Sequence, residues 1–216
     1  MEEATIDFNF KARYFKLGQI QENTEQIWFV CHGYGQLAYY FIRNFKPLDD
    51  GRHVVIAPEG LSRFYLEGFS GRVGATWMTR DNRLMDIDNY TAYLNEIYAK
   101  EIPSTIPAHI KINVLGFSQG AATVSRWIMQ DQVHFDRLIL WAGIFPSDID
   151  LEAGHQKLKK HQIAVVHGTK DPFIDPEQEA MQQKLITALR IDPKRYTFNG
   201  AHEIESTTLA QLAADL

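Results

Sequence analysis

The sequence predicts an α/β protein in which helices cover both faces of a mostly parallel central sheet. Two observations carry this prediction. Short apolar runs rich in Val, Ile, Leu and aromatic residues each end at glycine or proline, which is typical of buried parallel strands. Segments with helical spacing of apolar residues separate these runs, so that strands and helices alternate along the chain. Ligands of such sheets bind beyond the carboxyl ends of the strands.

The individual elements follow from the same patterns. The buried strands are expected at 25–33, 52–60, 110–118, 135–143 and 162–171. Residues 12–19 alternate more and predict an antiparallel edge strand, and residues 194–202 predict the last strand. Helices are expected over 82–102, from just after Ser118 to about Gln130, from Pro176 onward, and over 203–216.

Composition narrows the class of protein. The 216 residues contain no repeat, low-complexity stretch or Pro/Ser-rich linker, so a single domain over 1–216 is expected. The net charge is −5 without a basic cluster, which argues against a nucleic-acid partner. One cysteine, no signal-peptide pattern and no long apolar run indicate a cytoplasmic protein without stable membrane insertion.

The most informative motif is Gly116-Phe117-Ser118-Gln119-Gly120, which fits G-x-S-x-G between an expected strand and an expected helix. A serine on so sharp a turn forces the strand and the helix together. Side chains two positions to either side would then collide, and glycine removes the collision. The helix start also offers N–H groups to a developing oxyanion. The alternative is a tight structural turn with an incidental serine.

A serine nucleophile needs a base and a group that orients the base. In α/β-hydrolases the chain order is Ser, then Asp or Glu, then His. Asp171 follows one expected strand and His202 follows the last one, so both are expected at the edge of the sheet that carries Ser118. These three residues are the predicted catalytic triad.

Other polar residues have simpler interpretations. Asp175 is expected to cap the helix that starts at Pro176. The remaining candidates are expected to be surface carboxylates (Asp148 and Asp150), turn-bracing histidines (His32 and His167), surface histidines (His53, His109, His134, His155 and His161) and a small core thiol (Cys31). Neither zinc-site spacing nor a phosphate-binding glycine loop is present, so no metal or cofactor is expected.

A second glycine-containing segment completes the expected site. A strand runs into His32-Gly33-Tyr34-Gly35, where glycines allow the backbone to approach the nucleophile. This loop and the N–H group of Gln119 are therefore expected to form an oxyanion hole. A simple glycine-rich turn is the alternative interpretation.

With "CHGYG", "APEG", "GFSQGAA", "HGTKDPFI" and "GAHEI" in this order, the chain resembles the phospholipase/carboxylesterase family of small α/β-hydrolases, which includes acyl-protein thioesterases. The resemblance covers about residues 25–205. It implies an α/β-hydrolase fold, Ser118 as nucleophile, Asp171 as orienting acid, His202 as base and the backbone N–H groups of Tyr34 and Gln119 as the oxyanion hole. The segment 143–161 is too short for a large lid, so little or no lid is expected. The chain departs from the family in its aromatic residues near the site, and these bear on the substrate.

The aromatic segments predict a pocket for an acyl or aromatic group. Tyr34, Phe69 and Trp77 are the expected substrate contacts, with Tyr39, Phe64 and Tyr65 as further candidates; a core-packing role is the alternative. The predicted activity is hydrolysis of small acyl esters or thioesters through an acyl-enzyme. A peptidase or amidase with the same triad, and a non-catalytic binding protein of this fold, are the alternatives. Exposed aromatics near the site would also suit a homodimer.

Overall fold

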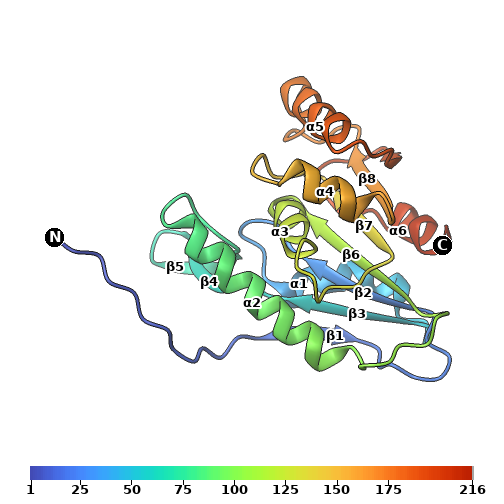
Figure 1. The fold of residues 1–216 in the computed structure, drawn as a ribbon, viewed down its shortest axis with the longest axis horizontal. Coiled ribbons are helices and arrows are strands. Elements are labelled where there is room, and N and C mark those ends of the chain that lie inside the picture. The colour runs from blue at the N-terminus through green and yellow to red at the C-terminus, as the bar shows by residue number, and fades with distance from the viewer. Residues whose placement is uncertain (216) are drawn as a thin grey trace.

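The computed structural model describes residues 1–215 (Figure 1). The strands are β1 (Tyr14–Leu17), β2 (Gln26–Cys31), β3 (His53–Pro58), β4 (Ser62–Glu67), β5 (Ser70–Thr76), β6 (Lys111–Phe117), β7 (Arg137–Trp141), β8 (Gln162–Gly168) and β9 (Lys194–Phe198). The helices are α1 (Ala38–Phe41), the 3₁₀ helix η1 (Ile42–Leu48), α2 (Arg83–Glu101), α3 (Gln119–Trp127), α4 (Leu151–Leu158), α5 (Pro176–Ala188) and α6 (Ser206–Ala214).

Within these residues, the main sheet has seven strands in the order β1-β3-β2-β6-β7-β8-β9. β1 is antiparallel to β3, and all other neighbouring pairs in this sheet are parallel. Every residue of β2, β3 and β7 is buried, as expected for strands covered on both faces. The predicted parallel sheet and its antiparallel edge strand are thereby confirmed.

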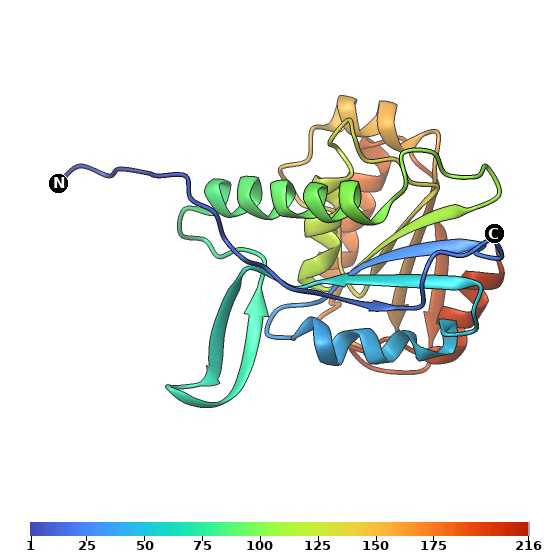
Figure 2. The same cartoon turned by 90° about the horizontal axis from the view of Figure 1, so that it is seen from below.

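Helices lie on both faces of this sheet (Figure 2), and each face carries a hydrophobic core. On one face, residues of α2 to α5 pack against inward-pointing strand residues, with Phe29 and Trp127 at 5.3 Å between ring centroids. On the other face, α1, η1 and α6 pack around Trp28, Phe45 and Leu209, which are fully buried. Each such side chain contributes about 1.5–3 kcal/mol of transfer free energy. The two cores hold the strands in place and so position the loops at their carboxyl ends.

Capping residues define the helices that flank the expected site. Asp175 accepts a hydrogen bond from the Gln178 N–H at 2.8 Å, and Pro176 occupies the first turn of α5, as the sequence predicts. Asp150 caps α4 in the same way through the Ala153 N–H at 2.9 Å. The sequence analysis did not predict α4, and it assigned Asp150 to a surface loop.

The sequence analysis also missed the hairpin of β4 and β5. These strands pair with each other, antiparallel and with an irregularity between Tyr65 and Glu67. Most of their side chains are exposed, so they lack the continuous apolar run of a buried strand. Figure 2 shows the hairpin projecting from the body of the protein, and residues 1–13 leaving it as an extended arm.

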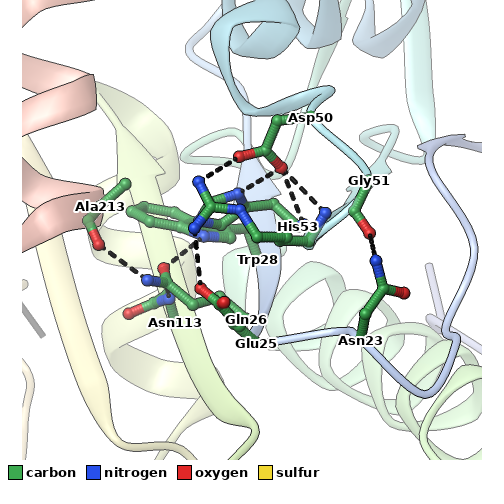
Figure 3. Close-up of polar contacts among 10 residues, drawn as sticks. Asn23, Glu25, Gln26, Trp28, Asp50, Gly51, His53, Asn113 and Ala213 are labelled. Atoms are coloured by element: carbon green, nitrogen blue, oxygen red, sulfur yellow. Dashed lines mark hydrogen bonds and ion pairs between the residues drawn. The ribbon is translucent and has the colours of Figure 1, made fainter.

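A polar network lies at the amino end of the sheet, opposite the expected site (Figure 3). The Gln26 amide donates to the Ala213 carbonyl at 2.7 Å and accepts from Trp28 Nε1 and Asn113 Nδ2 at 3.0 Å each. His53 is only 8% exposed, and its Nδ1 lies 2.8 Å from Asp50 Oδ1. The prediction of a surface role for His53 is therefore wrong. His53 is the first residue of β3, and its ring contacts Asp50 in the preceding turn.

No helix in the described part of the chain is long and apolar enough to span a bilayer.

Candidate active site

Ser118 lies at the junction between β6 and α3, at the carboxyl edge of the sheet. Its backbone has φ 53° and ψ −118°, a conformation that non-glycine residues rarely adopt. The Ser118 N–H donates to the Trp141 carbonyl at 2.8 Å and so is held by the adjacent strand. Strain of this kind costs about 1–3 kcal/mol and persists only where the surroundings impose it. The turn therefore has the geometry that the G-x-S-x-G motif predicts.

The two glycines of the motif are required by close backbone approaches. A Cβ built on Gly116 would lie 2.2 Å from the Gly120 carbonyl oxygen. A Cβ built on Gly120 would lie 2.2 Å from the carbonyl oxygen of Cys31, at the end of β2. Because backbone atoms cannot move aside cheaply, larger residues at either position would push α3 away from the sheet.

Asp171 and His202 are brought together by the loops that follow β8 and β9. His202 Nδ1 lies 2.7 Å from Asp171 Oδ2, and the Asp171 side chain is completely buried. The other carboxylate oxygen accepts the Phe173 N–H at 2.9 Å. In a neutral imidazole whose Nδ1–H donates to a carboxylate, Nε2 carries the lone pair that a general base requires.

A third glycine lets these two loops meet. A Cβ built on Gly168 would lie 2.3 Å from the Gly200 carbonyl oxygen. The loops are also joined by two backbone hydrogen bonds, from the Lys170 N–H to the Gly200 carbonyl at 2.9 Å and from the Thr169 N–H to the Phe198 carbonyl at 2.8 Å. The distance between Asp171 and His202 is thus set by the backbone as well as by their side chains.

Two aromatic rings hold the His202 imidazole. The ring centroid of Phe117, the residue before Ser118, lies 4.8 Å from that of His202, and Phe173 contacts it edge-on at 4.7 Å. His202 therefore lies beside the Ser118 turn. The Ser118 hydroxyl makes no hydrogen bond within residues 1–215, so the link from serine to histidine is not formed in this structure. Such links are often long in unliganded enzymes.

The loop after β2 approaches Ser118 from the other side. A Cβ built on Gly33 would lie 3.1 Å from the Ser118 Cβ, and the Gly33 N–H donates to Gln36 Oε1 at 2.8 Å. The Tyr34 and Gln119 N–H groups have no acceptor among residues 1–215. Two unused donors on segments that flank a serine have the chemistry of an oxyanion-binding site.

The side chain of Gln119 fastens the base of the hairpin to the start of α3. Its Nε2 donates to the Met78 carbonyl at 3.0 Å and to Thr76 Oγ1 at 2.9 Å, while its Oε1 accepts the Trp77 N–H at 3.2 Å. The hairpin is also joined to the loop after β2, because the Gly35 N–H donates to the Ala75 carbonyl at 2.9 Å. Both expected oxyanion donors thus lie on segments that the hairpin base braces.

His32 supports the same loop from inside the protein. Its Nε2 accepts the Gly60 N–H at 2.9 Å, so Nδ1 carries the proton and donates to the Gly33 carbonyl at 2.8 Å. Burial lowers the pKa of His32 to about 4, and the Gly33 bond and nearby Glu59 oppose this shift only in part. His32 is therefore neutral at pH 7. The sequence analysis correctly expected it to brace a turn.

The three aromatic residues expected to contact substrate differ in their exposure. Tyr34 is exposed and packs against Phe64 of β4 at 5.2 Å between centroids. Phe69 is fully exposed, in the turn at the far end of the hairpin. Trp77 departs from the expectation: its ring is 2% exposed and its Nε1 donates to the His32 carbonyl, so it backs the loop from the core. The sequence analysis did not identify Phe173 as a site residue. Its position two residues after Asp171 in the sequence was the only indication.

A cavity of about 390 Å³ lies beside this region, between β8, α5 and the loop after β7. Its apolar lining includes Ile144, Val165 and Ile174. Gly143, another lining residue, packs directly on the nucleophile turn: a Cβ there would lie 2.5 Å from the Ser118 carbonyl oxygen. The cavity next to the site therefore has a mixed lining, because His167, Gln182 and Arg195 also line it.

Neither a reactive thiol nor a metal-binding cluster is found among the described residues. Cys31 is buried, and burial raises the pKa of its thiol, so it stays protonated. No group of three or more His, Cys, Asp or Glu residues within 1–215 is arranged to hold a metal ion.

The comparison with known proteins agrees with this geometry. The fold is that of the α/β-hydrolases, which carry their polar groups at this edge of the sheet. The sequence profile of the phospholipase/carboxylesterase family matches residues 18–216, and the chain belongs to this family. No curated protein matches the chain.

Several solved structures share the fold. The esterase PE8 superimposes with a TM-score of 0.70 at 17% identity, covering 95% of this chain and 97% of that one. Acyl-protein thioesterase 2 from Zea mays has a TM-score of 0.69 at 18% identity, covering 94% and 97%. A phospholipase/carboxylesterase from Dyadobacter fermentans has a TM-score of 0.67 at 16% identity, covering 97% and 98%. The chain is thus a hydrolase-family protein of esterase type.

Proposed function

We propose that the protein is a serine hydrolase that cleaves carboxylic esters or thioesters through an acyl-enzyme. Ser118 is the nucleophile, His202 the general base and Asp171 the residue that orients it. The Tyr34 and Gln119 N–H groups bind the oxyanion. The observation that carries this proposal is the 2.7 Å hydrogen bond between His202 Nδ1 and a fully buried Asp171 carboxylate, beside a serine in a strained turn.

The mechanism follows from the groups in place. His202 Nε2 removes the Ser118 proton as Oγ attacks the acyl carbon, and the negative charge develops on the carbonyl oxygen between the two N–H groups. The imidazolium then protonates the leaving alcohol or thiol. Water, activated by the same Nε2, attacks the acyl-enzyme and releases the acid. Asp171 accepts the Nδ1–H throughout and stabilises the imidazolium.

The surroundings of the site support a small substrate with an apolar part. The cavity beside Gly143 combines an apolar side, with Ile144, Val165 and Ile174, and a polar side from α5, and its volume suits a short acyl or alcohol group. Tyr34 and Phe64 add an exposed aromatic wall on the other side. Phe69 at the end of the hairpin and Trp77 in the core make poorer substrate contacts, and we leave both out of the proposed pocket.

The decisive experiment combines turnover with active-site labelling. Wild-type protein is expected to hydrolyse short-chain p-nitrophenyl esters and to react covalently with a fluorophosphonate probe. Ser118→Ala is expected to lose both properties, with kcat lower by a factor on the order of 10⁵–10⁶. Ser147→Ala is the matched control, because Ser147 is an exposed loop serine without a place in the mechanism.

Each outcome is informative. Full turnover by Ser118→Ala would refute the assignment of the nucleophile. Wild-type protein that neither turns over esters nor reacts with the probe would favour a non-catalytic binding protein. Parallel assays with matched esters, thioesters and amides separate an esterase or thioesterase from an amidase.

The cellular setting forms part of the same proposal. A single cysteine that is fully buried suits a reducing compartment, and we propose a cytoplasmic location for a protein that acts as one domain over its whole length.

A further inference from the structure

The N-terminal arm, residues 1–13, carries large apolar side chains that the rest of the chain does not cover. Ile6, Phe8 and Phe10 are 86%, 75% and 54% exposed. They occupy alternating positions, and the rings of Phe8 and Phe10 meet edge-on at 6.3 Å, so they share one face of the extended arm. This alternation is the pattern of a strand with one buried face, yet the arm has no strand partner within residues 1–215.

The hairpin of β4 and β5 likewise has exposed apolar side chains and a strand edge without a partner in the described residues. Three of its residues, the cross-strand pair Tyr65 and Val73 and Phe69 in the turn, are between 36% and 98% exposed and are called here the hairpin surface. β4 pairs with β5 on one side and has no strand partner on its outer edge in the described chain. Natural proteins rarely leave an apolar edge strand unprotected, because its free N–H and C=O groups bind further strands.

The arm and the hairpin project from the same end of the molecule but diverge (Figure 2). Asn82 at the start of α2 donates to Glu3 of the arm at 3.4 Å, so the tip of the arm lies beside α2, while Phe10 near its base shares a cavity lining with Arg63 of β4. The charges of the two segments are complementary. Residues 1–10 of the arm carry three acidic side chains, and its two basic residues, Lys11 and Arg13, lie at its base; the hairpin carries Arg63 and Arg72 against one glutamate, Glu67.

We propose that the occupant of both surfaces is a second copy of this chain, in a two-fold dimer with exchanged arms. The arm of each protomer adds as a strand to the outer edge of β4 in the other, and Ile6, Phe8 and Phe10 cover the partner's hairpin surface. Two-fold symmetry buries both arms at once. Aromatic side chains bury about 150–250 Å² each, so two arms and the surfaces they cover reach the roughly 1,200–2,000 Å² of a stable interface.

The first experiment measures mass in solution. Full-length protein is expected to be a dimer by size-exclusion chromatography with light scattering at micromolar concentration. The double variant Phe8→Asp/Phe10→Asp is expected to be a monomer, with a dissociation constant raised at least about 100-fold. Both positions are exposed in the free chain, so its circular dichroism should match that of wild type, while its melting temperature should no longer depend on protein concentration. Met181→Asp, at an exposed apolar position on α5 far from the arm, is expected to remain a dimer.

The second experiment identifies which chain the arm contacts. The only native cysteine is buried, so introduced thiols can be cross-linked selectively with a short bismaleimide. Mixing a Phe8→Cys chain with a Tyr65→Cys chain is expected to yield a cross-linked pair of chains. A monomeric wild type, a dimer that survives the double Asp variant, or cross-links formed only within one chain that carries both cysteines would each overturn the proposal. Because the readouts are mass and cross-linking, they do not depend on esterase activity.

Discussion

His202 and Asp171 are joined by a 2.7 Å hydrogen bond between Nδ1 and Oδ2, although they lie on loops that follow different strands. The carboxylate has no solvent exposure, and its second oxygen is occupied by the Phe173 N–H. The bond therefore fixes both the orientation and the tautomer of the imidazole. Its removal should alter chemistry far more than stability.

Asp171→Asn tests that bond. An amide at this position can donate to Nδ1, which would favour the tautomer with the proton on Nε2 and disable the base. We expect kcat for p-nitrophenyl esters to fall by about 10³–10⁴-fold with little change in KM. Asp175→Asn, four residues away at the cap of α5, should leave kcat unchanged. Equal effects of the two substitutions would contradict the role given to Asp171.

Phe173→Ala should have a smaller and different effect. The ring packs edge-on against His202 at 4.7 Å but is 62% exposed, so it positions the imidazole and adds little to the core. Loss of an aromatic contact of about 0.5–1.5 kcal/mol predicts a 2- to 10-fold lower kcat with an unchanged melting temperature. Phe173→Tyr should restore kcat. A variant that melts earlier and keeps its kcat would instead show a purely structural role.

Gly120→Ala should disrupt the protein. The added methyl group would lie 2.2 Å from the Cys31 carbonyl oxygen, so α3 must shift and take the Ser118 turn with it. We expect a destabilisation of at least about 2 kcal/mol in urea unfolding and loss of ester turnover. Gly154→Ala in α4 is the control, because its methyl group meets only the flexible end of Leu189. A stable and active Gly120→Ala protein would show that the helix and β2 are less closely packed than described.

His32 should make the protein sensitive to acid. Its pKa is about 4 when folded and near 6.5 when unfolded, so between these values the unfolded chain binds a proton that the folded chain does not. By linkage, the contribution is complete above pH 6.5 and is lost as the pH falls toward 4, a change of about 3 kcal/mol. His32→Gln should remove this slope from urea unfolding measured between pH 7 and 4. His109→Gln, at an exposed position, should keep it.

The sequence predicted most of the sheet because buried parallel strands leave continuous apolar runs that end at glycine or proline. Asp171 and His202 could be found by the same logic, since each follows such a run. The hairpin could not, because exposed strands that pair only with each other lack this signal. The sequence also could not distinguish Trp77, which is buried, from Tyr34, which is exposed, because both are aromatic residues in glycine-rich segments.

The left-handed backbone of Ser118 implies that this protein would become more stable if it lost its proposed nucleophile. Glycine tolerates positive φ without the steric penalty of a Cβ, so Ser118→Gly should relieve the turn. We expect its free energy of unfolding to rise by about 1 kcal/mol while ester turnover disappears. Selection for thermal robustness alone would therefore favour glycine at position 118, so the proposed nucleophile carries a cost in stability.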